Sequence, residues 1–238
     1  MQGPDRDIEI LVVYYSRFGV LKILAEQIAE GARRAPGVRA ELLEVEDRPV
    51  EEVRSGESRA GMGRRRAAVL NRLASADALI VGAPAYFGSM ASPVKRLFED
   101  CATASTPFTT DRSRPWRNHR FHGKVGAAFT ASGTPHGGNE QALHSILTLM
   151  MHLGMVLVTP GQRPPILEHS AAPYGVTAIA GPDGNRPPDQ DVQDAARELG
   201  EQVAEVATWL VWGRHEWERL RREQRPRPVA GGPFDPSS

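Results

Sequence analysis

Five predicted strands, each separated from the next by a segment with helical spacing, constrain this chain more than any other feature of its sequence. The apolar runs at residues 8–14, 77–83 and 125–129 are almost continuous, as in strands that are buried on both faces of a sheet. The intervening segments carry apolar residues every three or four positions, which is typical of amphipathic helices. Strands that alternate with helices predict a parallel sheet with helices on both faces. The predicted strands are residues 8–14, 38–45, 77–83, 125–129 and 155–159, and the predicted helices are residues 21–32, 67–76, 90–101, 141–153 and about 189–210.

The length of 238 residues is enough to bury a substantial core, and it fits one large domain or two small ones. We expect one α/β domain over residues 1–212. From residue 213 the chain is rich in Arg, Glu, Pro and Gly, so residues 213–238 are predicted to be a charged tail, a frayed helix followed by disorder. The predicted long loops are residues 46–66, 102–120 and 160–188.

The charge balance and the single cysteine argue against several classes of protein. The 29 basic and 29 acidic residues give a formal net charge of +0, which does not support a nucleic-acid-binding or anionic-membrane surface. Cys101 alone cannot form an intramolecular disulfide framework or a zinc site, and no metal site is predicted. No apolar run approaches the roughly 20 residues of a membrane helix, and the polar N-terminus lacks a signal-peptide pattern. We therefore expect a cytoplasmic protein.

Three loops follow buried strands, at residues 16–21, 84–89 and 130–138, and they form the candidate site. Ligands of such sheets bind outside the carboxyl ends of the strands. The first loop offers the Ser16 hydroxyl, backbone N–H groups around Gly19 and the start of a helix, which together suit a phosphate dianion.

The other two loops suggest what else a ligand would meet. The middle loop places Tyr86 and Phe87 where a flat ring could lie. The third loop supplies hydroxyl groups and glycines that allow a ligand to approach the backbone closely. The three loops together predict a site with a phosphate end and an aromatic middle.

The first loop is weak evidence when it is taken alone. It matches neither the phosphate-binding pattern G-x-x-x-x-G-K-[ST] nor the dinucleotide pattern G-x-G-x-x-G. A plain strand-to-helix turn explains this loop at least as well, so only the combination of loops favours a cofactor site.

Five segments in order resemble the signature segments of the WrbA-type NAD(P)H:quinone oxidoreductases. The resemblance covers residues 8–211 and implies a flavodoxin-like fold, a doubly wound parallel five-stranded sheet in the order 2-1-3-4-5, with FMN as cofactor and NADH or NADPH as reductant. It also implies a homotetramer, or a dimer, with sites where subunits meet. The segments are "LVVYYSRFG", "GAPAYFGSM", "FTASGTPHGGNEQ", "MHLGMV" and "PYGVTAIAGPDGNRPP".

The resemblance also implies roles for individual residues. The FMN phosphate would be held by Ser16, Arg17, Phe18, Gly19, Val20 and Leu21, and the flavin ring would pack against the loop of Pro84, Ala85, Tyr86 and Phe87. The ribityl chain and the polar ring edge would bind Thr130, Ala131, Ser132, Gly133, Thr134 and Pro135. His152 would reach the flavin of a neighbouring subunit. The nicotinamide or substrate would contact Phe18 and Trp116, and Tyr174 either packs or lines the substrate cavity.

The chain departs from the family pattern at four places. Gly19 is followed by Val20 and Leu21, where the family has Gly-His-Ile, so one polar contact to the phosphate is missing. The loop at residues 102–120 is longer and carries several arginines, the third loop has an extra residue, and the tail from residue 213 has no counterpart. These departures make the affinity for FMN the first property to test.

The function implied is FMN-dependent, two-electron reduction of quinones by NAD(P)H with ping-pong kinetics. No side chain is needed as a nucleophile, because the flavin carries the redox chemistry. One alternative is reduction of free FMN or of nitro or azo compounds. Another, from a different class, is a flavodoxin-like electron carrier or a flavin-binding regulatory protein.

Overall fold

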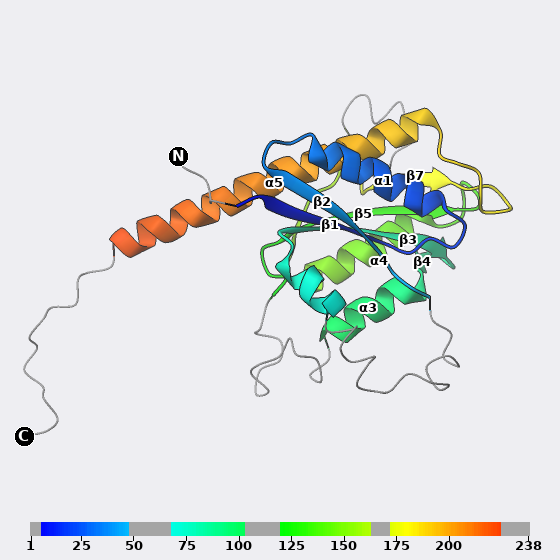
Figure 1. Cartoon of the computed structure of the whole chain (residues 1–238). Helices are drawn as coiled ribbons and strands as arrows, with labels where there is room; N and C mark the ends of the chain where they lie inside the picture. Colours follow the sequence, from blue (N-terminus) through cyan, green and yellow to red (C-terminus); the bar gives the residue numbers. More distant parts are fainter. Residues whose placement is uncertain (1–5, 48–67, 103–119, 163–171, 225–238) are drawn as a thin grey trace, which may run out of the picture.

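The computed structural model describes residues 6–47, 68–102, 120–162 and 172–224, and Figure 1 shows their arrangement. The strands are β1 (Ile8–Tyr14), β2 (Val38–Glu44), β3 (Ala78–Tyr86), β4 (Ser89–Met90), β5 (Val125–Ser132), β6 (Val156–Leu157) and β7 (Val176–Ile179). The helices are α1 (Val20–Arg33), α3 (Ser92–Ala102), α4 (Asn139–His152) and α5 (Gln190–Glu223), and residues 68–75 are also helical.

The sheet has the strand order β2-β1-β3-β5-β6, and each neighbouring pair in this order is parallel. This order confirms the flavodoxin-like prediction, with one correction. The fifth position holds two short strands: β6 pairs with the start of β5 and β7 with its end. Pro160, which cannot donate a ladder hydrogen bond, follows β6 closely, and the predicted strand at residues 155–159 is therefore cut short.

Helices cover both faces of this sheet, as Figure 1 shows: α1 and α5 lie on one face, and α3 and α4 lie on the other. Alternate residues of β1 divide between the two faces. Ile10 and Val12 are buried in the cluster under α1 and α5. Leu11 and Val13 are buried in the cluster formed with α3, α4 and the helix at residues 68–75. Both faces of β1 are therefore core, which explains its continuous apolar run.

Two strands run further toward the carboxyl edge than predicted, which corrects the loop boundaries. β3 continues to Tyr86 and β5 continues to Ser132. Pro84 lacks an N–H group, and it is tolerated in β3 because pairing with β1 ends at Gly82. On its other side Pro84 stays in register with Ala131 of β5. The candidate loops therefore begin on paired strands that hold them rigidly.

Helix α5 continues without a break to Glu223, so the predicted boundary between residues 212 and 213 falls inside a helix. Its last turns extend away from the sheet in Figure 1. Residues 225–238 lie outside the described residues, as do Trp116 and most of the predicted loop at residues 102–120.

Candidate functional site

A cavity of about 210 Å³ lies at the carboxyl edge of the sheet, where the three predicted loops meet. A fourth loop, which follows β7, completes its lining. The lining residues are Ser16, Arg17, Phe18, Val20, Leu21, Pro84, Ala85, Tyr86, Ala131, Ser132, Gly133, Ala180, Gly181, Pro182, Asp183 and Gly184. Eleven of these are among the seventeen residues predicted to bind the cofactor.

The first wall of the cavity is the N-terminus of α1. Gly19 caps this helix in the left-handed conformation, with φ of 94°, and no side chain bonds to the first turn. The Gly19 N–H group donates to the Ser16 hydroxyl oxygen at 3.1 Å. The N–H groups of the first helical turn have no intrahelical acceptor, and this turn contains no acidic residue. The loop therefore offers backbone donors and the positive end of a helix dipole to an anion.

The Val20 and Leu21 side chains, which replace the expected polar contact, are both buried at 3% exposure in the core under α1. By packing in the core, these two side chains fix the position of the first turn of α1, and this turn lines the cavity. An anion at this helix end would meet backbone N–H groups and not these side chains.

The second wall is the hairpin of β3 and β4, which replaces the predicted open loop at residues 84–89. Ala85 and Tyr86 line the cavity. Phe87 does not line it: this residue has φ of 52° in the turn, and its side chain is fully exposed. The aromatic side chain that the cavity receives from this hairpin is Tyr86.

The third wall is the end of β5, and its hydroxyl groups are mostly used within the protein. The Thr130 hydroxyl donates to the Ala83 carbonyl oxygen at 2.6 Å and is fully buried. The Ser132 hydroxyl donates to the Thr134 carbonyl oxygen at 2.7 Å. Neither Thr130 nor Thr134 lines the cavity, and Pro135 lines a neighbouring hollow instead. On this side the cavity is therefore lined by Ala131 and Ser132, whose strand is already paired with β3 and β7, and by Gly133, which follows the strand.

The loop at residues 180–184 is the wall that sequence reasoning missed. The Ala180 N–H group donates to the Ser132 carbonyl oxygen at 2.7 Å, which ties this loop to the end of β5. A Cβ atom on Gly184 would lie 2.8 Å from Cδ2 of Phe18 and would push that ring aside, and the φ of 74° at Gly184 also favours glycine. The segment "AGPDG" carried the signal, since turn residues directly follow a short apolar run.

Two charged side chains, Arg17 and Asp183, are among the cavity-lining residues. The Arg17 guanidinium carbon lies 5.6 Å from the centre of the Phe18 ring, a cation–π contact at the mouth. Apart from these charges and the hydroxyl groups of Ser16, Tyr86 and Ser132, the lining is apolar or glycine, which suits a planar ligand with an anionic group.

Two of the predicted residues lie away from this cavity. His152 ends α4, at the edge of the sheet where β5 begins, and is exposed. Tyr174 packs against His144 of α4, with ring centres 4.3 Å apart. Within one chain neither reaches the cavity, so the predicted contact of His152 with a neighbouring subunit's flavin stays a prediction.

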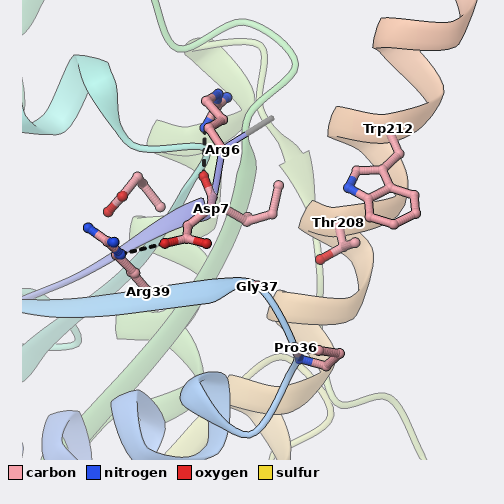
Figure 2. Close-up of a pocket in the computed structure, with 9 residues that line it drawn as sticks. Arg6, Asp7, Pro36, Gly37, Arg39, Thr208 and Trp212 are labelled. Carbon is pink, nitrogen blue, oxygen red and sulfur yellow. Dashed lines mark hydrogen bonds and ion pairs between the residues drawn. The ribbon is translucent and has the colours of Figure 1, made fainter. Parts of the chain in front are cut away.

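A larger hollow of about 650 Å³ lies at the opposite, amino edge of the sheet. Figure 2 shows Arg6, Asp7, Arg39, Thr208 and Trp212 around it; Arg6 donates to the Asp7 backbone carbonyl oxygen and forms its ion pair with Asp77. The Arg39 Nε atom is 2.6 Å from the Asp7 carboxylate. Because these charges are already paired, and because ligands of such sheets bind at the carboxyl edge, the smaller cavity is the better candidate.

The described residues bear on two further predictions. They contain no group of three His, Cys, Asp or Glu side chains placed to hold a metal ion. No helix among them is both long enough and apolar enough to cross a membrane.

Comparison with known proteins agrees with the fold. A family model described as NADPH-dependent FMN reductase matches residues 10–164. A protein named NAD(P)H dehydrogenase (quinone) from Caulobacter vibrioides is 37% identical over 85% of this chain and 98% of its own length. The protein of the same name from Acidovorax ebreus is 38% identical over 86% of this chain and 99% of its own length.

Among solved structures, a flavodoxin, WrbA-like protein from Agrobacterium tumefaciens has a TM-score of 0.54 at 23% identity, covering 84% of this chain and 98% of that chain. At this identity the likeness supports the fold alone. The family model and the two relatives show more: the chain belongs to the NAD(P)H dehydrogenase (quinone) family of flavodoxin-like proteins, as its resemblance to the WrbA-type proteins predicted.

Proposed function

We propose that this protein is an FMN-dependent enzyme that oxidises NAD(P)H and reduces quinones by two electrons. The observation that carries the proposal is the convergence of the N-terminus of α1, whose first turn bonds no capping side chain, with a largely apolar, glycine-containing cavity at the carboxyl edge of the sheet. Relatives named NAD(P)H dehydrogenase (quinone) support the choice of quinone as acceptor.

The residues around the cavity fit FMN. The first turn of α1 has free N–H groups and no competing carboxylate, so it suits the phosphate. A Cβ atom on Gly133 would lie 3.2 Å from the Gly181 carbonyl oxygen, so two loops meet backbone to backbone where the cofactor would enter. Ala85 and Tyr86 offer apolar surface to the ring.

When bound, FMN would accept two electrons from a reduced nicotinamide and pass them to an acceptor. The chain's own part is to bind and orient. The end of β5 is held rigidly by its pairing on both sides, and Gly133, which follows it, lines the cavity, where its backbone N–H group would stabilise negative charge on a bound ring. The reductant and the acceptor would use the same mouth in turn, which predicts ping-pong kinetics.

A second candidate function is reduction of free FMN, and the description of the matching family model favours it. In that case FMN would leave after reduction, so the affinity for FMN would be low. An electron carrier of the flavodoxin type is the alternative from another class. It would bind FMN without turning over NAD(P)H.

One experiment separates these functions. The purified protein is titrated with FMN, and NAD(P)H oxidation is then followed with a panel of quinones. Tight FMN binding with quinone-dependent turnover supports the proposal. FMN binding without NAD(P)H oxidation would indicate a carrier, and the absence of any flavin binding would overturn both.

The resemblance supports three finer proposals. The protein would assemble as a homotetramer, or a dimer, with His152 reaching the flavin of a neighbouring subunit; a cytoplasmic location is proposed from the sequence alone. Phe18 would contact the nicotinamide. Trp116, which lies outside the described residues, would contact the nicotinamide or the substrate. For Tyr174 the packing alternative is favoured within one chain, because its ring packs against His144.

A further inference from the structure

Phe87 carries two unfavourable features at once. It is the one residue other than glycine with a positive φ, 52°, among the described residues. The left-handed conformation is unfavourable for a residue with a Cβ atom, and more so for a bulky one. Its ring is also fully exposed, with a relative accessibility of 108%, so it gains nothing from burial. Strain of this kind persists where the surrounding structure enforces it, and it often marks a functional position.

The surrounding structure does hold this turn in place. Ala85 pairs with Met90 and Tyr86 with Ser89 on either side of it. The Met90 N–H group donates to the Ser145 hydroxyl of α4 at 2.9 Å. The Phe87 backbone is thus fixed by the hairpin and by its attachment to α4.

Glycines seat the turn against the start of α4. Gly88 follows Phe87 with φ of 73°, and a Cβ atom on Gly138 would lie 2.8 Å from the Gly88 Cα atom. This backbone-to-backbone contact leaves the turn little freedom to relax. The backbone that carries the exposed ring is therefore preorganised, and a ligand that stacks on the ring would lose little free energy in ordering it.

The turn that contains Phe87 comes directly after a cavity-lining residue in the sequence. Tyr86, the preceding residue, lines the cavity and is 37% exposed, and Phe18 on the facing loop is 56% exposed. The enclosed volume of about 210 Å³ is below the roughly 300 Å³ at which small-molecule sites usually begin. A cofactor and its reaction partner would therefore extend beyond the cavity, past the partly exposed Tyr86 and Phe18 that line it.

We propose that Phe87 is a binding residue for the electron acceptor, and that its ring stacks on a planar aromatic quinone at the mouth of the cavity. This inference rests on the proposed function. It differs from the role that the resemblance implied for Phe87, which was packing against the flavin.

The chemistry of a phenyl ring determines which acceptors depend on it. Phe87 has no hydrogen-bonding group, so its contribution comes from stacking and grows with the area of the acceptor ring. A naphthoquinone depends on it more than benzoquinone does. Ferricyanide, an inorganic anion, does not stack at all. NAD(P)H depends on it less than quinones do, because its phosphates provide separate anchors.

The test compares three substitutions in the full-length, FMN-loaded protein. Phe87→Leu keeps the strained backbone but removes the flat ring, and Phe87→Tyr keeps the ring. Phe87→Asn removes the ring and also tolerates the left-handed conformation. Trp217→Leu, at an exposed aromatic residue on α5, is the matched control. KM and kcat are measured with menadione, benzoquinone and ferricyanide, the thermal midpoint is recorded, and the oligomeric state is measured by sedimentation.

We expect Phe87→Leu and Phe87→Asn to raise KM for menadione about 2- to 12-fold, the range that a stacked aromatic pair contributes. The change is smaller for benzoquinone and absent for ferricyanide. Phe87→Tyr and Trp217→Leu leave all three values unchanged. Phe87→Asn also raises the thermal midpoint by about 2–4 °C, because it relieves roughly 1 kcal/mol of strain.

Other outcomes would overturn the inference. Unchanged KM for menadione in both ring-deleted variants excludes stacking on the acceptor. An equal loss with ferricyanide would indicate that Phe87 supports the flavin instead. Dissociation of an oligomer in parallel with the rise in KM would assign Phe87 to a subunit contact. If the unmodified protein reduces no quinone, the proposed function itself fails, which is a separate result.

Discussion

The two edges of the sheet differ in how completely their polar groups are satisfied. At the carboxyl edge the first turn of α1 has N–H groups without intrahelical acceptors, and glycines leave the cavity open. At the amino edge Asp77 accepts two hydrogen bonds from Arg6, at 2.7 and 2.8 Å, and one from the Glu9 N–H group at 3.0 Å. At the carboxyl edge backbone N–H donors of α1 are available to a ligand. At the amino edge the donors of Arg6 and Glu9 already bond to Asp77 and so connect β1 with the start of β3.

This difference predicts a separation of effects. Substitutions at the carboxyl edge should weaken ligand binding with a smaller loss of stability, whereas substitutions at the amino edge should do the reverse. Variants at the two edges can therefore be compared for their FMN affinity and for their free energy of unfolding.

The largest effect is expected from Gly19→Val at the N-terminus of α1. A β-branched residue cannot readily hold φ of 94°, so the first-turn donors would lose their alignment. FMN binding should weaken about 10- to 100-fold, the range for a hydrogen bond to a charged group. Fluorescence titration with FMN measures it. Unchanged affinity would show that the phosphate binds elsewhere.

The next effect is expected from Asp77→Asn at the amino edge. The change removes charge-assisted hydrogen bonds from a side chain that is 11% exposed, so the free energy of unfolding should fall by about 1.5–3 kcal/mol. The affinity for FMN should stay within about twofold. Arg39→Gln is the control, since that guanidinium is 69% exposed and its pair should contribute less than about 1 kcal/mol. Urea unfolding compares the variants, and weakened FMN binding in Asp77→Asn would refute the separation.

A pH dependence of stability follows from the same carboxylate. Burial alone would raise the pKa of Asp77, but the hydrogen bonds from Arg6 and the Glu9 N–H group, with the charges of Arg6 and Lys124, hold it below its ordinary value of 3.8. Its contribution is therefore complete above pH 3.8 and is lost as the pH falls through the lower, folded-state pKa. The stability difference between the unmodified protein and Asp77→Asn should stay constant from pH 7 to 5 and narrow below pH 3.8. A difference that narrows already near pH 6 would point to another group.

The smallest effect is expected from Arg17→Ala. The guanidinium lies over the exposed Phe18 ring and would add screened charge near the phosphate. FMN binding should weaken less than about fivefold at low salt, and the loss should shrink as the ionic strength rises. Titrations at two salt concentrations measure this. A large loss that is independent of salt would mean that Arg17 makes a direct, desolvated contact.

Features set by local pattern could be predicted from the sequence. The continuous apolar run before Tyr14 and the stripe that begins at Leu21 predicted β1 and α1, and parallel topology then predicted which loops would meet. Pro84 and Thr130 were assigned to loops because turn and hydroxyl residues usually mark loops. Pairing between β3 and β5 overrode that local preference.

The missing wall of the site could not be predicted from pattern alone. β7 is four residues long and lies in a region rich in Pro and Gly, so neither its pairing with β5 nor the position of Gly184 against Phe18 was visible. These are contacts between residues far apart in the chain. The conformation of Phe87 was hidden for the same reason, since the hairpin and α4 enforce it together.

The most direct test of the central claim is an anaerobic experiment in two half-reactions on the FMN-loaded protein. One equivalent of NADPH, or of NADH, is mixed with the protein while the flavin absorbance near 450 nm is followed, and one equivalent of menadione is added afterwards. The account predicts complete bleaching, complete recovery on adding the quinone, and smaller amplitudes of both signals in Gly19→Val, in proportion to the FMN that dissociates. Bleaching that menadione does not reverse, or no bleaching by either nucleotide, would contradict it.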